Sequence, residues 1–286
     1  MNEIKQKIAY LYLDLYPPGI EISGEGTCFD EEGRFYCCIC GDGLPKILRV
    51  DQKKQAEVFA ELSAEDRPCG LVFHDGRYYC CCLNGVLYVL NQDGKIIDGI
   101  TPIYEERSLM MNDLIFIDDD IYVTDFRGDY IRRSGGVFVL KAEDRYRRAE
   151  LLLGGLCSPN GIAYHDGRLF VSETTANDVL RIQLDRNKKA AEEFGVMPIY
   201  SNIGKGGGLD SIKMSSDGLL YQAVIARGRV LELDEEGIVK EIITVEGAEE
   251  GKNLLTPNLA LNEKEGYGLI LAFGSDGLKL MRFAIE

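Results

Sequence analysis

Four oxygen-bearing side chains recur at nearly the same distance before a turn, although dozens of residues separate them. Each lies 7 or 8 residues ahead of the residue that closes an alternating apolar segment. The four are Glu25, Asn112, Asn160 and Asp210. Asparagine and aspartate are common turn formers, but turn chemistry gives no reason for four such side chains to keep one register. We therefore predict that they converge in the folded chain.

Two carboxylates and two amide oxygens form a hard ligand set with a formal charge of −2. Calcium accepts about 6 to 8 oxygen ligands, so four protein ligands would leave positions for water and a substrate. The sequence therefore predicts a Ca²⁺ site, with Mg²⁺, Zn²⁺ or Mn²⁺ as alternative divalent cations. At the same position two further segments carry Cys69 and Asn258, and Asn258 is a candidate fifth ligand.

Six segments share one pattern, in which apolar alternation leads through an acidic or Asp-Gly turn into an aromatic-led strand. Their turn residues are 43 to 51 residues apart, which is typical of one propeller blade per repeat. These residues are Gly33, Gly76, Asp120, Gly167, Gly218 and Gly266. We predict an all-β, six-bladed β-propeller that forms a single domain over residues 1–286. A ring closes by joining its chain ends, so residues 8–16 are expected to complete the last blade.

The formal net charge of −15 is unfavourable for binding nucleic acid or an anionic membrane surface. A small-molecule lactone or ester is the predicted partner, and the oligomeric state is left open. Residues 1–7 lead into a tyrosine-rich alternation instead of an apolar signal segment, and no window resembles a membrane span. Nine cysteines, an odd number, favour reduced thiols and predict a cytoplasmic protein.

Several stretches resemble the senescence marker protein, regucalcin and gluconolactonase family, and are most similar to its drug-responsive lactonases. They are GEG from Gly24, ND from Asn112, VTDFRG with GGVF over 123–138, NGIA with VSETTAN over 160–177, and LDS with GRVLEL over 209–233. The resemblance implies one catalytic cation in the central tunnel, held by Glu25, Asn160 and Asp210. It also implies that Asn112 contacts the metal, its water or the substrate, that Ser211 joins the site, and that Asp210 transfers the proton.

The sequence departs from the family pattern at two places, one that concerns the substrate and one that concerns a second calcium ion. Members that act on sugar lactones carry an arginine two places before the ND asparagine, where this chain has Met110. Met110 and Phe273 therefore predict an apolar substrate-binding pocket and a lactone less polar than a sugar acid. Drug-responsive lactonases are also expected to bind a second, structural calcium ahead of ND, but residues 104–109 do not supply that pattern, and no second site is predicted.

We predict a calcium-dependent lactonase. The cation would polarise the carbonyl as a Lewis acid and position the attacking water, while Asp210 would accept the proton of that water and return it to the ring oxygen. The chain has only two histidines, and no nucleophilic triad is evident. Two alternatives stay open: a phosphotriesterase for organophosphate esters on the same centre, and a non-enzymatic propeller that binds calcium or another ligand.

Overall fold

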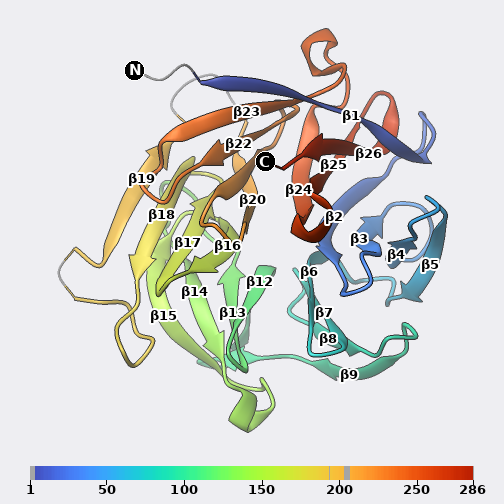
Figure 1. Ribbon diagram of the computed structural model, residues 1–286. Helices are drawn as coiled ribbons and strands as arrows, with labels where there is room; N and C mark the ends of the chain where they lie inside the picture. Colours follow the sequence, from blue (N-terminus) through green and yellow to red (C-terminus); the bar gives the residue numbers. More distant parts are fainter. Residues whose placement is uncertain (1–3, 193, 203–206, 286) are drawn as a thin grey trace.

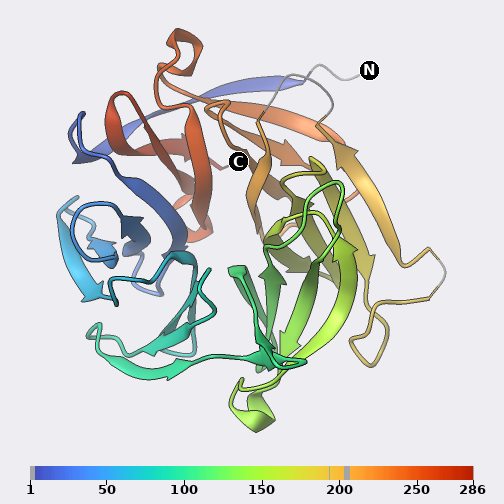
Figure 2. The ribbon, with the colours of Figure 1, turned by 180° about the vertical axis from the view of Figure 1, so that it is seen from behind.

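The computed structural model describes residues 4–192, 194–202 and 207–285, which fold into antiparallel sheets arranged in a ring (Figure 1). The reverse view shows the same ring from its other face (Figure 2). Helical structure among these residues is limited to the 3₁₀ turns η1 (Ala142–Asp144), η2 (Ala248–Glu250) and η3 (Glu263–Glu265). No helix in the described ranges has the length and apolar character needed to cross a membrane. The prediction of an all-β, propeller-like fold is confirmed.

Four sheets are separate, and each holds four strands in sequence order. The first contains β2 (Ser23–Phe29), β3 (Phe35–Cys40), β4 (Lys46–Val50) and β5 (Ala56–Glu61). The second contains β6 (Pro68–His74), β7 (Arg77–Cys82), β8 (Leu87–Leu90) and β9 (Ile96–Ile100). The third contains β12 (Met111–Ile117), β13 (Asp120–Asp125), β14 (Gly135–Leu140) and β15 (Ala149–Leu156), preceded in the chain by the hairpin of β10 (Ile103–Tyr104) and β11 (Arg107–Ser108). The fourth contains β16 (Pro159–His165), β17 (Arg168–Glu173), β18 (Asp178–Gln183) and β19 (Val196–Ser201).

The remaining eight strands form one continuous sheet, which corrects the prediction of six separate blades. In spatial order they are β20 (Leu209–Met214), β21 (Leu220–Val224), β22 (Arg229–Leu233), β23 (Val239–Val245), β1 (Lys5–Tyr16), β26 (Gly277–Ala284), β25 (Tyr267–Gly274) and β24 (Leu255–Asn262). The reason is the length of β1, whose first residues pair in parallel with β23 and whose later residues pair antiparallel with β26 (Figure 1). One strand near the start of the chain thus joins the four strands β20–β23 to the three strands β24–β26 and completes the last group of four.

The turns between the first two strands of each sheet use residues that tolerate a positive φ. Gly218 has a φ of 88° between β20 and β21, a conformation that costs glycine little. In the third sheet Asp120, the predicted turn residue, is instead the first residue of β13. The turn there is made by Asp118 with a φ of 53°, because aspartate is among the few other residues that enter this region readily.

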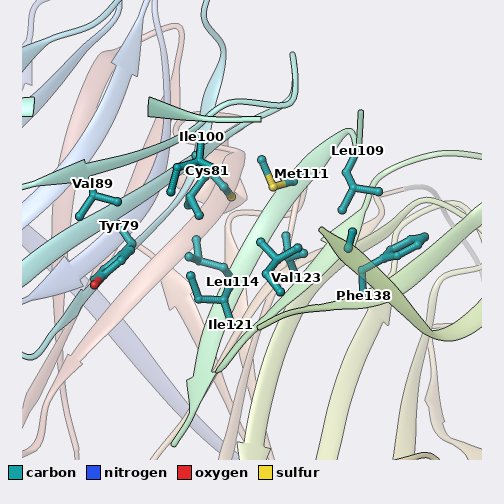
Figure 3. Packing of buried hydrophobic residues seen from close by; sticks show 13 residues of the cluster. Tyr79, Cys81, Val89, Ile100, Leu109, Met111, Leu114, Ile121, Val123 and Phe138 are labelled. Atoms are coloured by element: carbon teal, nitrogen blue, oxygen red, sulfur yellow. The ribbon is translucent and has the colours of Figure 1, made fainter. Parts of the chain in front are cut away.

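Buried apolar side chains fill the spaces between neighbouring sheets. Figure 3 shows one such interface, where Tyr79 and Cys81 of β7 lie opposite Leu114 of β12 and Val123 of β13. These side chains are at most 5% exposed, and burying each large one stabilises the fold by about 1.5–3 kcal/mol. The middle strands are buried on both faces, so packing between the sheets determines where the innermost strands β2, β6, β12, β16, β20 and β24 lie.

The innermost strands approach one another closely at Gly161. A Cβ added there would lie 2.3 Å from the backbone nitrogen of Ile212 on β20. Gly161→Ala should therefore force β16 and β20 apart and lower the free energy of unfolding by about 1–3 kcal/mol, measured by urea denaturation. Gly154→Ala on β15 is the matched control, because its Cβ would meet only Leu151 side-chain atoms at 3.5 Å or more. Equal stability losses in the two variants would contradict this account.

Candidate functional site

Each innermost strand carries a register shift at the position where the sequence places a ring residue. The shifts fall between Glu25 and Thr27, Pro68 and Gly70, Met111 and Leu114, Pro159 and Ile162, Leu209 and Ile212, and Leu255 and Asn258. A β-bulge bends its strand and re-aims the side chain it contains, and bulges are common beside active sites. The bulge recurs in all six innermost strands, so the same local distortion orients the side chain at each ring position. Sequence spacing alone does not provide this explanation.

The four predicted ligands line one cavity of about 890 Å³ at the centre of the ring. They come from four different innermost strands: Glu25 from β2, Asn112 from β12, Asn160 from β16 and Asp210 from β20. Asn160 and Asp210 are each only 4% exposed. The structure therefore brings together two carboxylates and two amides that lie as far apart in the chain as residues 25 and 210.

The two carboxylates are held in conditions that disfavour their charge. Burial raises the pKa of Glu25 well above its usual value, and the nearby carboxylates of Asp210 and Asp113 raise it further. Burial likewise raises the pKa of Asp210 to about 7, while a hydrogen bond from the Asn160 amide partly opposes the effect. A bound cation would stabilise the ionised form of both carboxylates, because it offsets their burial and their mutual repulsion.

Two oxygens of this cluster are buried and have no hydrogen-bond partner: Oδ1 of Asn160 and Oδ1 of Asp210. Buried polar atoms are nearly always paired, so unpaired oxygens that line a cavity indicate a missing ligand. Among the described residues no three His, Cys, Asp or Glu side chains converge as a metal site. The candidate ring offers two carboxylates and two amides instead, a set that suits a hard divalent cation. The residues present thus fit the predicted metal.

Two side chains on and directly after β17 hold Asp210 and Asn160 in place. The hydroxyl of Ser172 on β17 donates to the carbonyl oxygen of Asp210 at 2.5 Å. The Asn160 side-chain nitrogen donates to Thr174 Oγ1 at 3.1 Å, and that hydroxyl in turn donates to the Leu209 carbonyl at 2.7 Å. Because the Thr174 hydroxyl donates its only proton to the Leu209 carbonyl, its oxygen can only accept a hydrogen bond from the Asn160 side chain. This fixes the orientation of the Asn160 amide and leaves its oxygen unpaired.

Asn258, the candidate fifth ligand, is not among the residues that line the cavity, and its side chain is engaged by neighbouring groups. Its side-chain oxygen accepts hydrogen bonds from the Thr27 hydroxyl and the Leu259 backbone nitrogen, both at 2.9 Å. Its amide hydrogen-bonds the Glu25 carboxylate and lowers the pKa of that group, against the larger effect of burial. The amide nitrogen is the group that remains to donate. Asn258 therefore orients Glu25.

Ser211 does not line the cavity, and its hydroxyl instead donates to Oδ2 of Asp113 at 2.7 Å. Lys213 reaches the same carboxylate oxygen with its Nζ at 3.3 Å. The Asp113 side chain is 1% exposed, so Lys213 is the counter-charge of a buried anion behind the ring. Sequence reasoning missed this pair. The signal that could have found it is the acid of the ND dipeptide, Asp113, which lies in the same bulge as Asn112.

Removing the Lys213 charge should affect folding and cation binding in opposite directions. Lys213→Met leaves the Asp113 carboxylate without its counter-ion, so in chelator we expect the free energy of unfolding to fall by about 1–3 kcal/mol. The loss is smaller than for a fully buried ion pair, because the Lys213 side chain is 20% exposed. The more negative site should bind Ca²⁺ several times more tightly, measured by titration calorimetry. Lys279→Met, which breaks a surface pair with Asp14, serves as the control. Weaker Ca²⁺ binding by the Lys213 variant would contradict the account.

Met110 and Phe273, the predicted apolar lining, are not among the residues that line the cavity. Met110 is fixed through its backbone, which donates to Oδ1 of the buried Asp125 at 2.7 Å. Phe273 packs against the apolar cluster between the first sheet and β24–β26. The apolar wall of the cavity comes instead from other loops and strands: Ile22, Pro45, Pro68, Leu83, Phe126 and Ile225. The same wall carries one cation, Arg67.

The profile of the SMP-30/Gluconolactonase/LRE-like region matches residues 23–250 of this chain. The chain belongs to this family. The match spans the innermost strands β2, β6, β12, β16 and β20, and so includes every predicted ligand. The resemblance that the sequence motifs indicated is therefore confirmed.

Similar proteins bear out both the family and its fold. Lactonase drp35 of Staphylococcus haemolyticus is 28% identical over 262 residues, which are 88% of this chain and 78% of that protein. The Lactonase drp35 of Staphylococcus aureus is 28% identical over 264 residues, with the same two coverages of 88% and 78%. Among solved structures, regucalcin of Agrobacterium tumefaciens, a calcium-binding protein, superposes with a TM-score of 0.74 at 14% identity, covering 99% of this chain and 96% of that one. A gluconolactonase of Xanthomonas campestris gives a TM-score of 0.74 at 18% identity, with coverages of 95% and 89%.

Proposed function

We propose that this member of the SMP-30/gluconolactonase family hydrolyses a lactone with the help of one divalent cation in the central cavity. The observation that carries the proposal is the pair of buried, unpartnered oxygens on Asn160 and Asp210. Two similar proteins are named lactonases. Ca²⁺ is the proposed cation because all candidate ligand atoms are oxygens. We infer that the eight-stranded sheet acts as two blades joined by β1, which makes six in a single domain.

Glu25, Asn112, Asn160 and Asp210 are the proposed ligands, and Ser211 would act through Asp113 instead of touching the cation. Once bound, the cation would supply Lewis-acid polarisation of the lactone carbonyl and lower the pKa of water at the site. Asp210 is the proposed general base, since its carboxylate lines the cavity and one of its oxygens is unpaired. After ring opening the same carboxyl group would return the proton to the leaving oxygen.

The main test is a hydrolysis panel of aromatic lactones, sugar lactones and an organophosphate triester, each assayed with Ca²⁺ and with chelator. Lactone turnover that chelator abolishes is the expected result. Turnover that persists without metal would overturn the proposed chemistry. Preference for the triester would favour the phosphotriesterase alternative, and Ca²⁺ binding without any turnover would favour a binding propeller.

All nine cysteines are free thiols, and the sulfurs of Cys38 and Cys80 lie 3.8 Å apart in a hydrogen bond, without a disulfide. A chain that retains close, unpaired thiols suits a reducing compartment. This supports the proposal that the protein works in the cytoplasm.

A further inference from the structure

Arg67 is the only cationic side chain among the described residues that line the central cavity. It stands in the loop before β6 and is solvent-exposed, on a wall that also carries Glu21 and Asp66. Its guanidinium makes no hydrogen bond or ion pair within the described part of the chain. A free guanidinium in a cavity rich in carboxylates calls for a physical explanation, because nearby acids would ordinarily pair with it.

The neighbouring acid, Asp66, is engaged elsewhere. Its carboxylate accepts hydrogen bonds from the Ser63 backbone nitrogen, the Asn84 amide and the Tyr88 hydroxyl, each at 2.8 Å. Its side chain therefore has three donors other than Arg67. Asp66 is 3% exposed, and its hydrogen bonds stabilise the loop before β6. It does not pair with Arg67, whose charge is left without this counter-ion.

The backbone of Arg67 is also fixed. Its carbonyl oxygen accepts hydrogen bonds from the Leu83 backbone nitrogen at 2.9 Å and from the Cys69 thiol at 3.4 Å. Cys69 occupies the ring position of the second sheet and lines the same cavity. The guanidinium also lies close enough to Cys40, another cavity residue, to lower the pKa of its thiol against the larger effect of burial. Arg67 is thus held beside the ring with its charged end available.

We propose that Arg67 recognises a carboxylate on the substrate, so that the preferred substrate is a lactone that bears a free carboxylate. This inference rests on the proposed lactone hydrolysis and adds the substrate class. A guanidinium binds a carboxylate through two parallel hydrogen bonds. A cavity of about 890 Å³ has room for such a ligand. Glu21 and Asp66 on the same wall would otherwise disfavour an anionic group there.

Arg67 supplies a cation that the sequence position of Met110 lacks. Met110 removes the cation that sugar-lactone members carry ahead of the ND asparagine, and the sequence alone therefore indicated an apolar pocket. The structure supplies a cation from another sheet, through the loop before β6. An anionic group would then sit on the wall formed by the first two sheets, on the side of Glu25 and Cys69.

The test compares two five-membered lactones, one with a carboxylate beside the ring oxygen and one with a methyl group there. Wild-type enzyme should favour the carboxylate lactone in kcat/KM. Arg67→Met should lower the ratio of the two kcat/KM values at least tenfold, chiefly by raising KM for the acid, and Arg67→Lys should lower it less because the charge is kept. Arg77→Met, at an exposed arginine outside the cavity lining, should leave the ratio as it is.

Loss of activity toward both lactones in equal proportion, or no wild-type preference for the acid, would overturn the inference. If neither lactone is hydrolysed, the proposed reaction fails but Arg67 can still be tested separately. Calorimetric binding of the ring-opened hydroxy dicarboxylate to the Ca²⁺-loaded protein should then weaken at least tenfold in Arg67→Met. Unchanged binding in that experiment would overturn the role of Arg67 independently of turnover.

Discussion

Asp210→Asn is expected to reduce lactone hydrolysis at least 100-fold at saturating Ca²⁺. The change removes the carboxylate that we propose as general base, and a positioned acid-base group contributes about 10²–10⁴ in rate. It also removes one of the two negative ligands, so the Kd for Ca²⁺ should rise at least tenfold, measured by calorimetry. Rates must therefore be taken at Ca²⁺ concentrations that saturate the variant.

The control for this variant is Asp30→Asn, at a carboxylate that is buried but lies outside the cavity. Asp30 is 8% exposed and accepts hydrogen bonds from the hydroxyls of Tyr36 and Tyr78 at 3.0 and 3.1 Å. Its replacement should cost folding stability while leaving kcat and Ca²⁺ affinity within about twofold of wild type. If Asp210→Asn kept most of its activity with Ca²⁺ bound, proton transfer would have to be assigned to another group.

The ring of ligands could be predicted because its cause is local and repeated. The same hairpin recurs in each sheet, so a constant count from turn to ring position selects equivalent places. Glu25, Asn160 and Asp210 line one cavity as this count requires. The orientation of the side chains in the ring could not be predicted from this count. The unpaired oxygen of Asn160 depends on Thr174, whose own proton goes to Leu209 on the next sheet, and no spacing within one repeat contains that information.

The pocket wall was predicted less well, for a related reason. Met110 was compared with a family position and Phe273 was assigned by residue type, but both side chains depend on packing between sheets. Phe273 belongs to the cluster that β1 helps to cover, and β1 reaches it only because it pairs with β26. Lys213 was overlooked because its partner Asp113 lies 100 residues away. Long-range pairs of single charges leave no periodic signal in one sequence.

In chelator, the metal-free protein is expected to lose stability as the pH rises from 5 to 8. The pKa of Asp210 is raised by burial from 3.8 to about 7 in the folded protein, so between these values the folded state binds more protons than the unfolded state. Stability must then fall with rising pH across that window. A shift of about three units corresponds to at most about 4 kcal/mol, and the raised pKa of Glu25 acts in the same direction.

Asp210→Asn removes the titration of this carboxyl and also its repulsion of Glu25, so the difference between the two proteins reports the contribution of Asp210 to the buried cluster. In chelator the stability of the wild type should approach that of the variant at about pH 4, where Asp210 is protonated in the folded state and partly protonated in the unfolded state. At about pH 8 the wild type should be less stable than the variant by several kcal/mol, measured by urea denaturation. With Ca²⁺ the order at pH 8 should reverse, since the cation binds only the ionised ring and its stabilisation therefore grows with pH. Binding at pH 6 should release protons, detected by calorimetry in buffers of different ionisation enthalpy. A wild type that gains stability over the variant from pH 5 to 8 without metal would mean that Asp210 has a compensating partner, and the cavity would then have no need of a cation.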